Sequence, residues 1–188
     1  MSTAADTGIR KHRLNVEEYY RMAEVGLLAP DARVELIEGE IIDIAPIGSR
    51  HAGAVDRLAQ MLIRAVGERA IVGVQRPIRL GTQSEPQPDL ALLRPHPDFY
   101  SEAHPTAADI LLLIEVSDTT WRYDREIKLS LYARHGIPEV WIANVDRKEL
   151  HCFRNLQGGT YFSGTLLQAD EVGFLSVIGM TLDLSGLF

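Results

Sequence analysis

The spacing of polar and apolar residues near the start of the chain predicts a short helix. Asn15 is followed three residues later by Glu18, a variant of the capping box in which two side chains satisfy backbone N–H groups at a helix start. Gly26 can adopt the left-handed conformation that commonly follows a helix, so the helix should end there. Residues 1–13 are small, polar or basic, and we expect them to form a flexible N-terminal tail.

A hairpin and a longer helix should follow. Val34–Ile37 and Glu40–Ile44 are separated by a Glu-Gly pair, and Gly39 can supply the positive φ of a tight turn. From Ser49, which we expect to cap the helix, apolar residues recur at helical spacing. Gly67 should end this second helix.

The pattern then changes to that of β-strands. Strands are predicted at Ile71–Gln75, Pro77–Leu80, Asp89–Leu93, Ile110–Val116, Val140–Ala143 and Leu150–Phe153, with two more short strands before an apolar C-terminal end. The run Ile110–Val116 is apolar apart from Glu115, so both of its faces should be covered, as in the middle of a sheet flanked by helices. A helix is expected from Asp124 to His135, with Gly136 after its last residue. With no repeat and no linker, the pattern predicts one α/β domain over residues 14–188.

Composition and charge narrow the function classes. A hydrophobic content of 46% with 24% charged residues is typical of a globular protein and excludes a disordered chain. The lone Cys152 cannot form an internal disulfide, and no apolar stretch has the length of a membrane span, so we expect a cytoplasmic protein. The net charge of −7 argues against tight non-specific DNA binding, which depends on cations. It is compatible with an acidic metal site, because a bound metal reverses the local sign.

Glu115 is the most informative residue of the sequence. It lies one place from the end of an otherwise apolar strand, where an unpaired carboxylate would cost several kcal/mol or shift its pKa until it became neutral. A positive partner must therefore meet it. A structural Arg or Lys, a backbone terminus and a metal ion all satisfy that requirement.

Asp89 favours a metal ion over the other possible partners of Glu115. It opens its own strand directly after Pro88. If this strand and the strand of Glu115 are antiparallel neighbours, the start of one lies beside the end of the other, and the two carboxylates converge. Oxygen ligands of this kind suit Mg²⁺ or Mn²⁺ better than zinc.

Lys128 allows two interpretations. It follows Asp124 by one helical turn, and an exposed pair at this spacing is worth a few tenths of a kcal/mol. Alternatively, Lys128 points back over the acidic edge of the sheet, where its ammonium could hold an attacking water or the scissile phosphate. Trp121 and Trp141 are interpreted as packing aromatics rather than base-stacking platforms.

The ordered set of these features resembles the PD-(D/E)xK nuclease superfamily, and more closely its Uma-two branch of restriction endonucleases. The segments that carry the resemblance are Arg33–Ile41, His51, Pro88–Leu93, Leu113–Ser117, Asp124–Lys128, Tyr132, Gly136 and Val140–Ile142. No single segment is specific, but their order and spacing cover nearly the whole chain. The resemblance implies a restriction-endonuclease-like fold, in which a mixed central β-sheet is flanked by helices and preceded by a helix and a hairpin.

The resemblance also implies roles for individual residues. Asp89 and Glu115 would bind Mg²⁺ or Mn²⁺, Lys128 would be the catalytic lysine, and Glu35 would complete the acidic cluster. His51 and Asp124 would be accessory residues. The chain departs from the superfamily at Ser117, where the usual lysine stands two residues after the glutamate. In this chain the lysine would come from the following helix.

The hypothesis from the sequence is a metal-dependent endonuclease that hydrolyses phosphodiester bonds of DNA. Two other interpretations stay open: a nuclease-fold module that binds nucleic acid or protein without cutting, and a metal-dependent phosphodiesterase acting on RNA or nucleotides. A homodimer is expected, since a duplex has two strands to cut and two-fold symmetry is the commonest oligomeric arrangement.

Overall fold

The computed structural model describes residues 11–168, 171–175 and 179–188. Its centre is a mixed sheet of six strands in the order β3-β4-β5-β6-β7-β8. The strands are β3 (Ile71–Val74), β4 (Leu90–Leu93), β5 (Ile110–Ser117), β6 (Val140–Asn144), β7 (Glu149–Gln157) and β8 (Thr160–Gln168). Only β5 and β6 are parallel, and the other neighbours are antiparallel. The mixed α/β architecture expected from the sequence is therefore confirmed.

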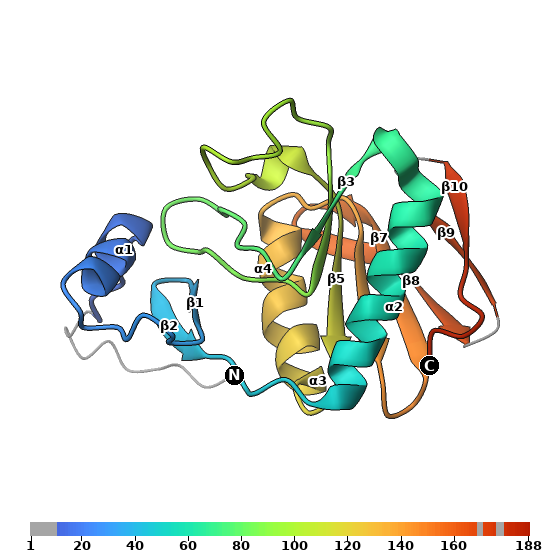
Figure 1. Cartoon of the computed structure of the whole chain (residues 1–188), viewed down its shortest axis with the longest axis horizontal. Helices are drawn as coiled ribbons and strands as arrows, with labels where there is room; N and C mark the ends of the chain where they lie inside the picture. Colours follow the sequence, from blue (N-terminus) through green and yellow to red (C-terminus); the bar gives the residue numbers. More distant parts are fainter. Residues whose placement is uncertain (1–10, 169–170, 176–178) are drawn as a thin grey trace.

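Helices cover both faces of this sheet (Figure 1). One face packs against α2 (Ser49–Val66), which contributes Val55, Leu58 and Leu62 to the larger apolar core. The other face packs against a continuous helical segment made of α3 (Trp121–Tyr123), a π-helical turn (Asp124–Lys128) and α4 (Leu129–Arg134). All eight residues of β5 are buried between these layers, as its apolar sequence predicts.

A smaller unit at the N-terminal end stands beside the sheet (Figure 1). It consists of α1 (Val16–Glu24) and the hairpin of β1 (Val34–Ile37) and β2 (Glu40–Asp43). The capping box of α1 is present, because Asn15 accepts a hydrogen bond from the N–H of Glu18 and its own N–H donates to the Glu18 carboxylate, each at 2.8 Å. The unit attaches to the loop before β4, where the N–H of Glu85 donates to the carbonyl of Leu36 at 2.7 Å.

Three local expectations were wrong. Residues 77–80 form no strand: their backbone N–H groups donate to Ser84, Pro86 and Pro105, and a ladder cannot continue where proline lacks an N–H. Gly48, in an extended conformation, is the N-cap of α2, so Ser49 is the first helical residue and does not cap it. The helix expected from Asp124 begins three residues earlier, at Trp121.

The C-terminal part also differs from the expectation of two short strands. β8 has nine residues, and β9 (Val172–Leu175) pairs with β10 (Met180–Asp183) in a separate two-stranded sheet. The start of the predicted tail lies outside the described residues, whereas Arg13 forms an ion pair with Glu40 of the hairpin at 2.6 Å. Within the described ranges, no helix has the length and apolarity needed to cross a membrane.

Candidate active site

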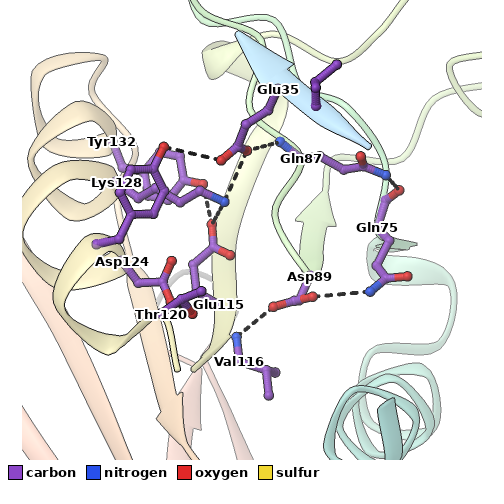
Figure 2. A network of polar contacts seen from close by, with 12 residues as sticks. Glu35, Gln75, Gln87, Asp89, Glu115, Val116, Thr120, Asp124, Lys128 and Tyr132 are labelled. Carbon is purple, nitrogen blue, oxygen red and sulfur yellow. Dashed lines mark hydrogen bonds and ion pairs between the residues drawn. The ribbon is translucent and has the colours of Figure 1, made fainter. Parts of the chain in front are cut away.

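The antiparallel pairing of β4 and β5 brings Asp89 beside the end of β5. Leu90 lies opposite Ile114, so Asp89, one residue before β4, lies beside Glu115 and Val116. The Asp89 Oδ2 atom accepts a hydrogen bond from the N–H of Val116 at 2.8 Å (Figure 2). The two strands are therefore antiparallel neighbours, the condition under which Asp89 and Glu115 were expected to converge.

Two side chains from other elements hold the second oxygen of Asp89. The Nε2 atom of His51, in the first turn of α2, lies 2.9 Å from Asp89 Oδ1. Gln75, directly after β3, donates its side-chain N–H to the same oxygen at 3.3 Å. The hydrogen bond to Asp89 raises the pKa of His51, and this gain exceeds the opposing effect of burial. Asp89 is thus a carboxylate oriented by three donors on the floor of the site.

Glu115 is buried and meets both a hydroxyl and an ammonium group. Its Oε1 atom accepts a short hydrogen bond from the Tyr132 hydroxyl and lies 3.3 Å from Lys128 Nζ. Burial raises the pKa of Glu115 well above its ordinary value, although Lys128 opposes the shift. The positive partner required by the sequence argument is therefore a lysine. Among the described residues, no contact is made by the other carboxylate oxygen, Oε2.

Lys128 lies between two carboxylates that come from distant parts of the chain. Its Nζ atom is 3.1 Å from Glu35 Oε2, on β1, and 3.3 Å from Glu115 Oε1, on β5 (Figure 2). Only 8% of the Lys128 side chain is exposed. Burial lowers its pKa, but Glu115, Glu35 and Asp124 outweigh burial, and the net pKa is raised. Lys128 is therefore a fixed cation.

Glu35 faces inward because it lies on the side of the hairpin that packs against the body. Besides Lys128, its Oε2 atom accepts a hydrogen bond from the N–H of Gln87 at 3.0 Å, while the Tyr123 hydroxyl approaches Oε1 at 3.4 Å. The hairpin thus delivers the carboxylate that fixes one side of the lysine. Both oxygens of Glu35 are contacted, and Lys128 Nζ is its charged partner.

Asp124 lies beneath Lys128 and is not its exposed partner. Its Oδ2 atom accepts hydrogen bonds from the hydroxyls of Ser117 and Thr120, each at 2.6 Å. Both Asp124 and Lys128 are buried, with 4% and 6% of their surfaces exposed. The interpretation of these two residues as a solvent-exposed helical pair is wrong, because the helix packs this face against the end of β5. Burial raises the pKa of Asp124, and Lys128 opposes the rise.

These residues line one cavity of about 430 Å³. Asp89, Glu115, Lys128, Glu35, His51 and Asp124 all border it. Apolar residues of β2 and of the segment that leads to α2 also line it, including Ile42, Ile44, Pro46 and Ile47. A cavity that combines apolar lining with a few convergent polar groups is the form expected of a small-molecule or substrate site.

The donor set fits a hard divalent cation coordinated by few protein groups. No cluster of three or more His, Cys, Asp or Glu side chains suited to a metal is found in the described ranges. Mg²⁺, however, commonly takes one or two carboxylates and completes its octahedron with water and substrate oxygens. Asp89 and the unengaged Oε2 of Glu115 can supply such a pair. The oxygen-only character of the pair favours Mg²⁺ or Mn²⁺ over zinc.

The structure brings together all six site residues named from the sequence and adds several that sequence reasoning did not assign. Tyr132 follows Lys128 by four residues, a spacing that places both on one face of the helix and could have revealed their shared partner. Gln75, Gln87 and Tyr123 carried no such signal, because their positions depend on how loops and hairpin dock.

Comparisons with known proteins identify the family and the fold of the chain. Residues 16–185 match the family described as "Uma2: Putative restriction endonuclease". No curated protein matches the sequence. Among solved structures, the chain is similar to one described as a putative nuclease belonging to DUF820, from Anabaena variabilis ATCC 29413. The TM-score is 0.69 at 15% sequence identity, over 93% of this chain and 97% of the other. At that identity the likeness shows the fold.

Proposed function

Because this chain belongs to the Uma2 family of restriction-endonuclease-like proteins, we propose that it is a divalent-metal-dependent endonuclease that hydrolyses phosphodiester bonds of DNA. The observation that carries the proposal is the arrangement around Lys128. A buried ammonium lies next to Glu115, and Glu115 lies beside the oriented carboxylate of Asp89. A hydrolase acting on phosphate needs both a cation site and a fixed positive charge near the scissile group.

Asp89 and Glu115 are the residues that would hold Mg²⁺ or Mn²⁺. Such an ion lowers the pKa of a bound water and stabilises charge that develops on the phosphate. The chain's own contribution is orientation. His51, Gln75 and the N–H of Val116 fix the Asp89 carboxylate, so little reorganisation is needed when a cation and substrate arrive.

Lys128 would stabilise negative charge on the phosphate in the transition state. Its position is set by Glu35, which holds Nζ from the hairpin side. Glu35 is therefore proposed as a residue that positions Lys128. In this chain the lysine comes from a helix, while the position two residues after the glutamate is Ser117, whose hydroxyl donates to Asp124.

The test is cleavage of supercoiled plasmid by purified protein with Mg²⁺ or Mn²⁺, compared with EDTA. Glu115→Gln and Asp89→Asn should abolish cleavage, whereas Glu126→Gln, on the exposed side of the same helical segment, should keep it. An active Glu115→Gln variant would contradict the proposed site. Metal binding without cleavage of plasmid, single-stranded DNA or RNA would favour a nuclease-fold module that does not cut. Cleavage of RNA or nucleotides alone would favour a phosphodiesterase.

A further inference from the structure

The outer edge of β8 is unusually open to pairing. β8 closes one side of the six-stranded sheet: β7 pairs with its inner edge, and no strand in the described ranges pairs with its outer edge. An unpaired edge offers a row of backbone donors and acceptors, and proteins commonly protect it by short length, charged side chains or proline. The opposite edge, β3, has only four residues. β8 has nine, and none of them is charged or proline.

Large apolar side chains add to this open edge. Phe162 is 69% exposed and Leu166 is 47% exposed. They are four residues apart on a strand, so they lie on the same face. On β7, His151 lies opposite Leu166, and Phe153 lies opposite Gly164, which stands between the two apolar side chains in sequence. An apolar strip therefore continues from the sheet to its open edge.

The sequence of β8 is self-complementary about Gly164. In an antiparallel pair of two identical strands centred on this glycine, Phe162 lies opposite Leu166 of the second copy, and the same contact repeats across the two-fold axis. Thr160 lies opposite Gln168 in the same way. Such an isologous contact covers both exposed apolar side chains of each copy at once.

Charge does not oppose the pairing of a second copy of this chain along the same strand. Each copy carries a net charge of −7, so two copies repel wherever acidic surfaces meet. β8 has no charged residue, and its self-pairing places no like charges opposite one another. A nine-residue strand spans about 30 Å, and with two apolar side chains its contact is at the lower end of the roughly 800 Å² per partner of specific interfaces.

We propose that the protein forms a homodimer through β8, with the two strands antiparallel about Gly164 and the two six-stranded sheets joined into one. We expect this dimer to dissociate on dilution through the micromolar range. This inference does not depend on the nuclease activity, because its evidence lies at the edge of the sheet away from Asp89 and Glu115 in strand order.

Light scattering with size exclusion provides the first test. The parent chain should be dimeric at about 100 µM, because this concentration is roughly a hundred times a Kd of about 1 µM. Phe162→Lys should give a monomer with an unchanged circular dichroism spectrum, since this side chain is mostly in solvent. Leu27→Lys is the matched control, because Leu27 is 71% exposed on another part of the chain, and it should remain dimeric. A monomeric parent chain, or a dimer unaffected by Phe162→Lys, would overturn the proposal.

Cysteine substitution tests the register. A Cβ built at Gly164 meets only Phe153, at 3.7 Å, so Gly164→Cys fits without displacing backbone. In the proposed pairing the two substituted positions face each other within disulfide range, and mild oxidation should give a reducible covalent dimer. Ser163→Cys is the control: its two copies are offset by two residues along the strands, beyond bridging distance. The native Cys152 is buried and should not react. Equal cross-linking of both variants would contradict the Gly164-centred pairing.

Discussion

Because it is buried, Lys128 should affect both stability and catalysis, which an exposed lysine would not do. It is buried between Glu35 and Glu115, with only 8% of its side chain in contact with solvent. Taking an ammonium out of water is costly unless carboxylates compensate, and removing the cation leaves those carboxylates buried without a counter-charge. The same residue is thus expected to matter for stability and for catalysis.

Lys128→Met should therefore lower the free energy of unfolding by roughly 2–4 kcal/mol, towards the range for breaking a buried ion pair. It should also reduce metal-dependent cleavage about 100-fold or more, as expected for loss of a charge-stabilising group. Arg122→Ala is the control, because Arg122 pairs with Glu126 at the same i,i+4 spacing but is 86% exposed. Its cost should stay within a few tenths of a kcal/mol. Urea unfolding measures the effect on stability, and cleavage rates measure the effect on activity. If the two variants lost similar amounts of each, Lys128 would behave as an ordinary exposed helix residue.

His51 should make stability depend on pH in the absence of metal. Its pKa is raised by the hydrogen bond to Asp89, so the folded state binds a proton more strongly than the unfolded state does. The stabilisation is fully present below the unfolded pKa of about 6.5 and is lost as pH rises through the folded pKa. In EDTA, His51→Gln should have a lower free energy of unfolding than the parent at pH 6. At pH 9 the two values should be nearly equal. A deficit independent of pH would exclude this linkage.

Among the elements, the β1–β2 hairpin affects the site because it carries Glu35. Its turn uses Gly39, with φ of +77°, and the backbone of Gly39 bonds to both Leu14 and Gln83. A side chain at this position would collide with the segment that enters α1: a built Cβ lies 2.7 Å from the Cβ of Arg13 and 3.0 Å from the N of Leu14. Both the tight turn and the packing of the hairpin against the segment before α1 thus require glycine at position 39.

Gly39→Ala should disturb the site through this element. Gly26 offers a matched control, since its φ is +76° and nothing lies within 4 Å of a Cβ built there. Both substitutions should cost about 1 kcal/mol for the left-handed backbone, and Gly39→Ala should cost about 1–3 kcal/mol more for overpacking. Only Gly39→Ala should also lower cleavage, because Glu35 moves with the hairpin. Equal stabilities of the two variants, measured by urea unfolding, would disprove the close contact at Gly39.

For the whole molecule, the charge balance explains why the site should be sensitive to metal. The chain has a net charge of −7, and six carboxylates border one cavity, among them Asp89, Glu115 and Asp124. Burial raises the pKa of Glu115 and of Asp124, so without a metal the folded state loses stability as pH rises through their folded pKa values. A cation in the cavity offsets this loss by favouring the charged forms.

Mn²⁺ or Mg²⁺ should therefore raise the melting temperature, and more so at pH 8 than at pH 6. At a metal concentration of 100 Kd the stabilisation is about 2.7 kcal/mol for one site. Glu115→Gln should abolish the metal-dependent shift. Without metal it should gain stability relative to the parent as pH rises, because the parent alone must ionise a buried carboxyl group. Thermal melts with and without metal at both pH values decide this, and a full metal shift in Glu115→Gln would place the ion elsewhere.

The sequence by itself determined most of the elements and the acidic edge. The capping box at Asn15, the turn at Gly39 and the largely apolar β5 are local patterns, and each produced the expected element. Glu115 was recognisable because a carboxylate inside an apolar strand requires a partner. Local patterns failed where proline interrupted pairing at residues 77–80 and where Gly48 replaced Ser49 as the N-cap.

Only the tertiary structure decided which charges meet. Lys128 and Asp124 have a spacing that suits an exposed pair, and nothing local distinguishes that pair from a buried one. The docking of the α3–α4 helical segment on the end of β5 buries both residues, and the docking of the hairpin brings Glu35 to Lys128 from 93 positions earlier in the chain. Periodicity reports which face of an element is apolar. It carries no information on which distant polar group that face will meet, because this depends on how the elements pack together.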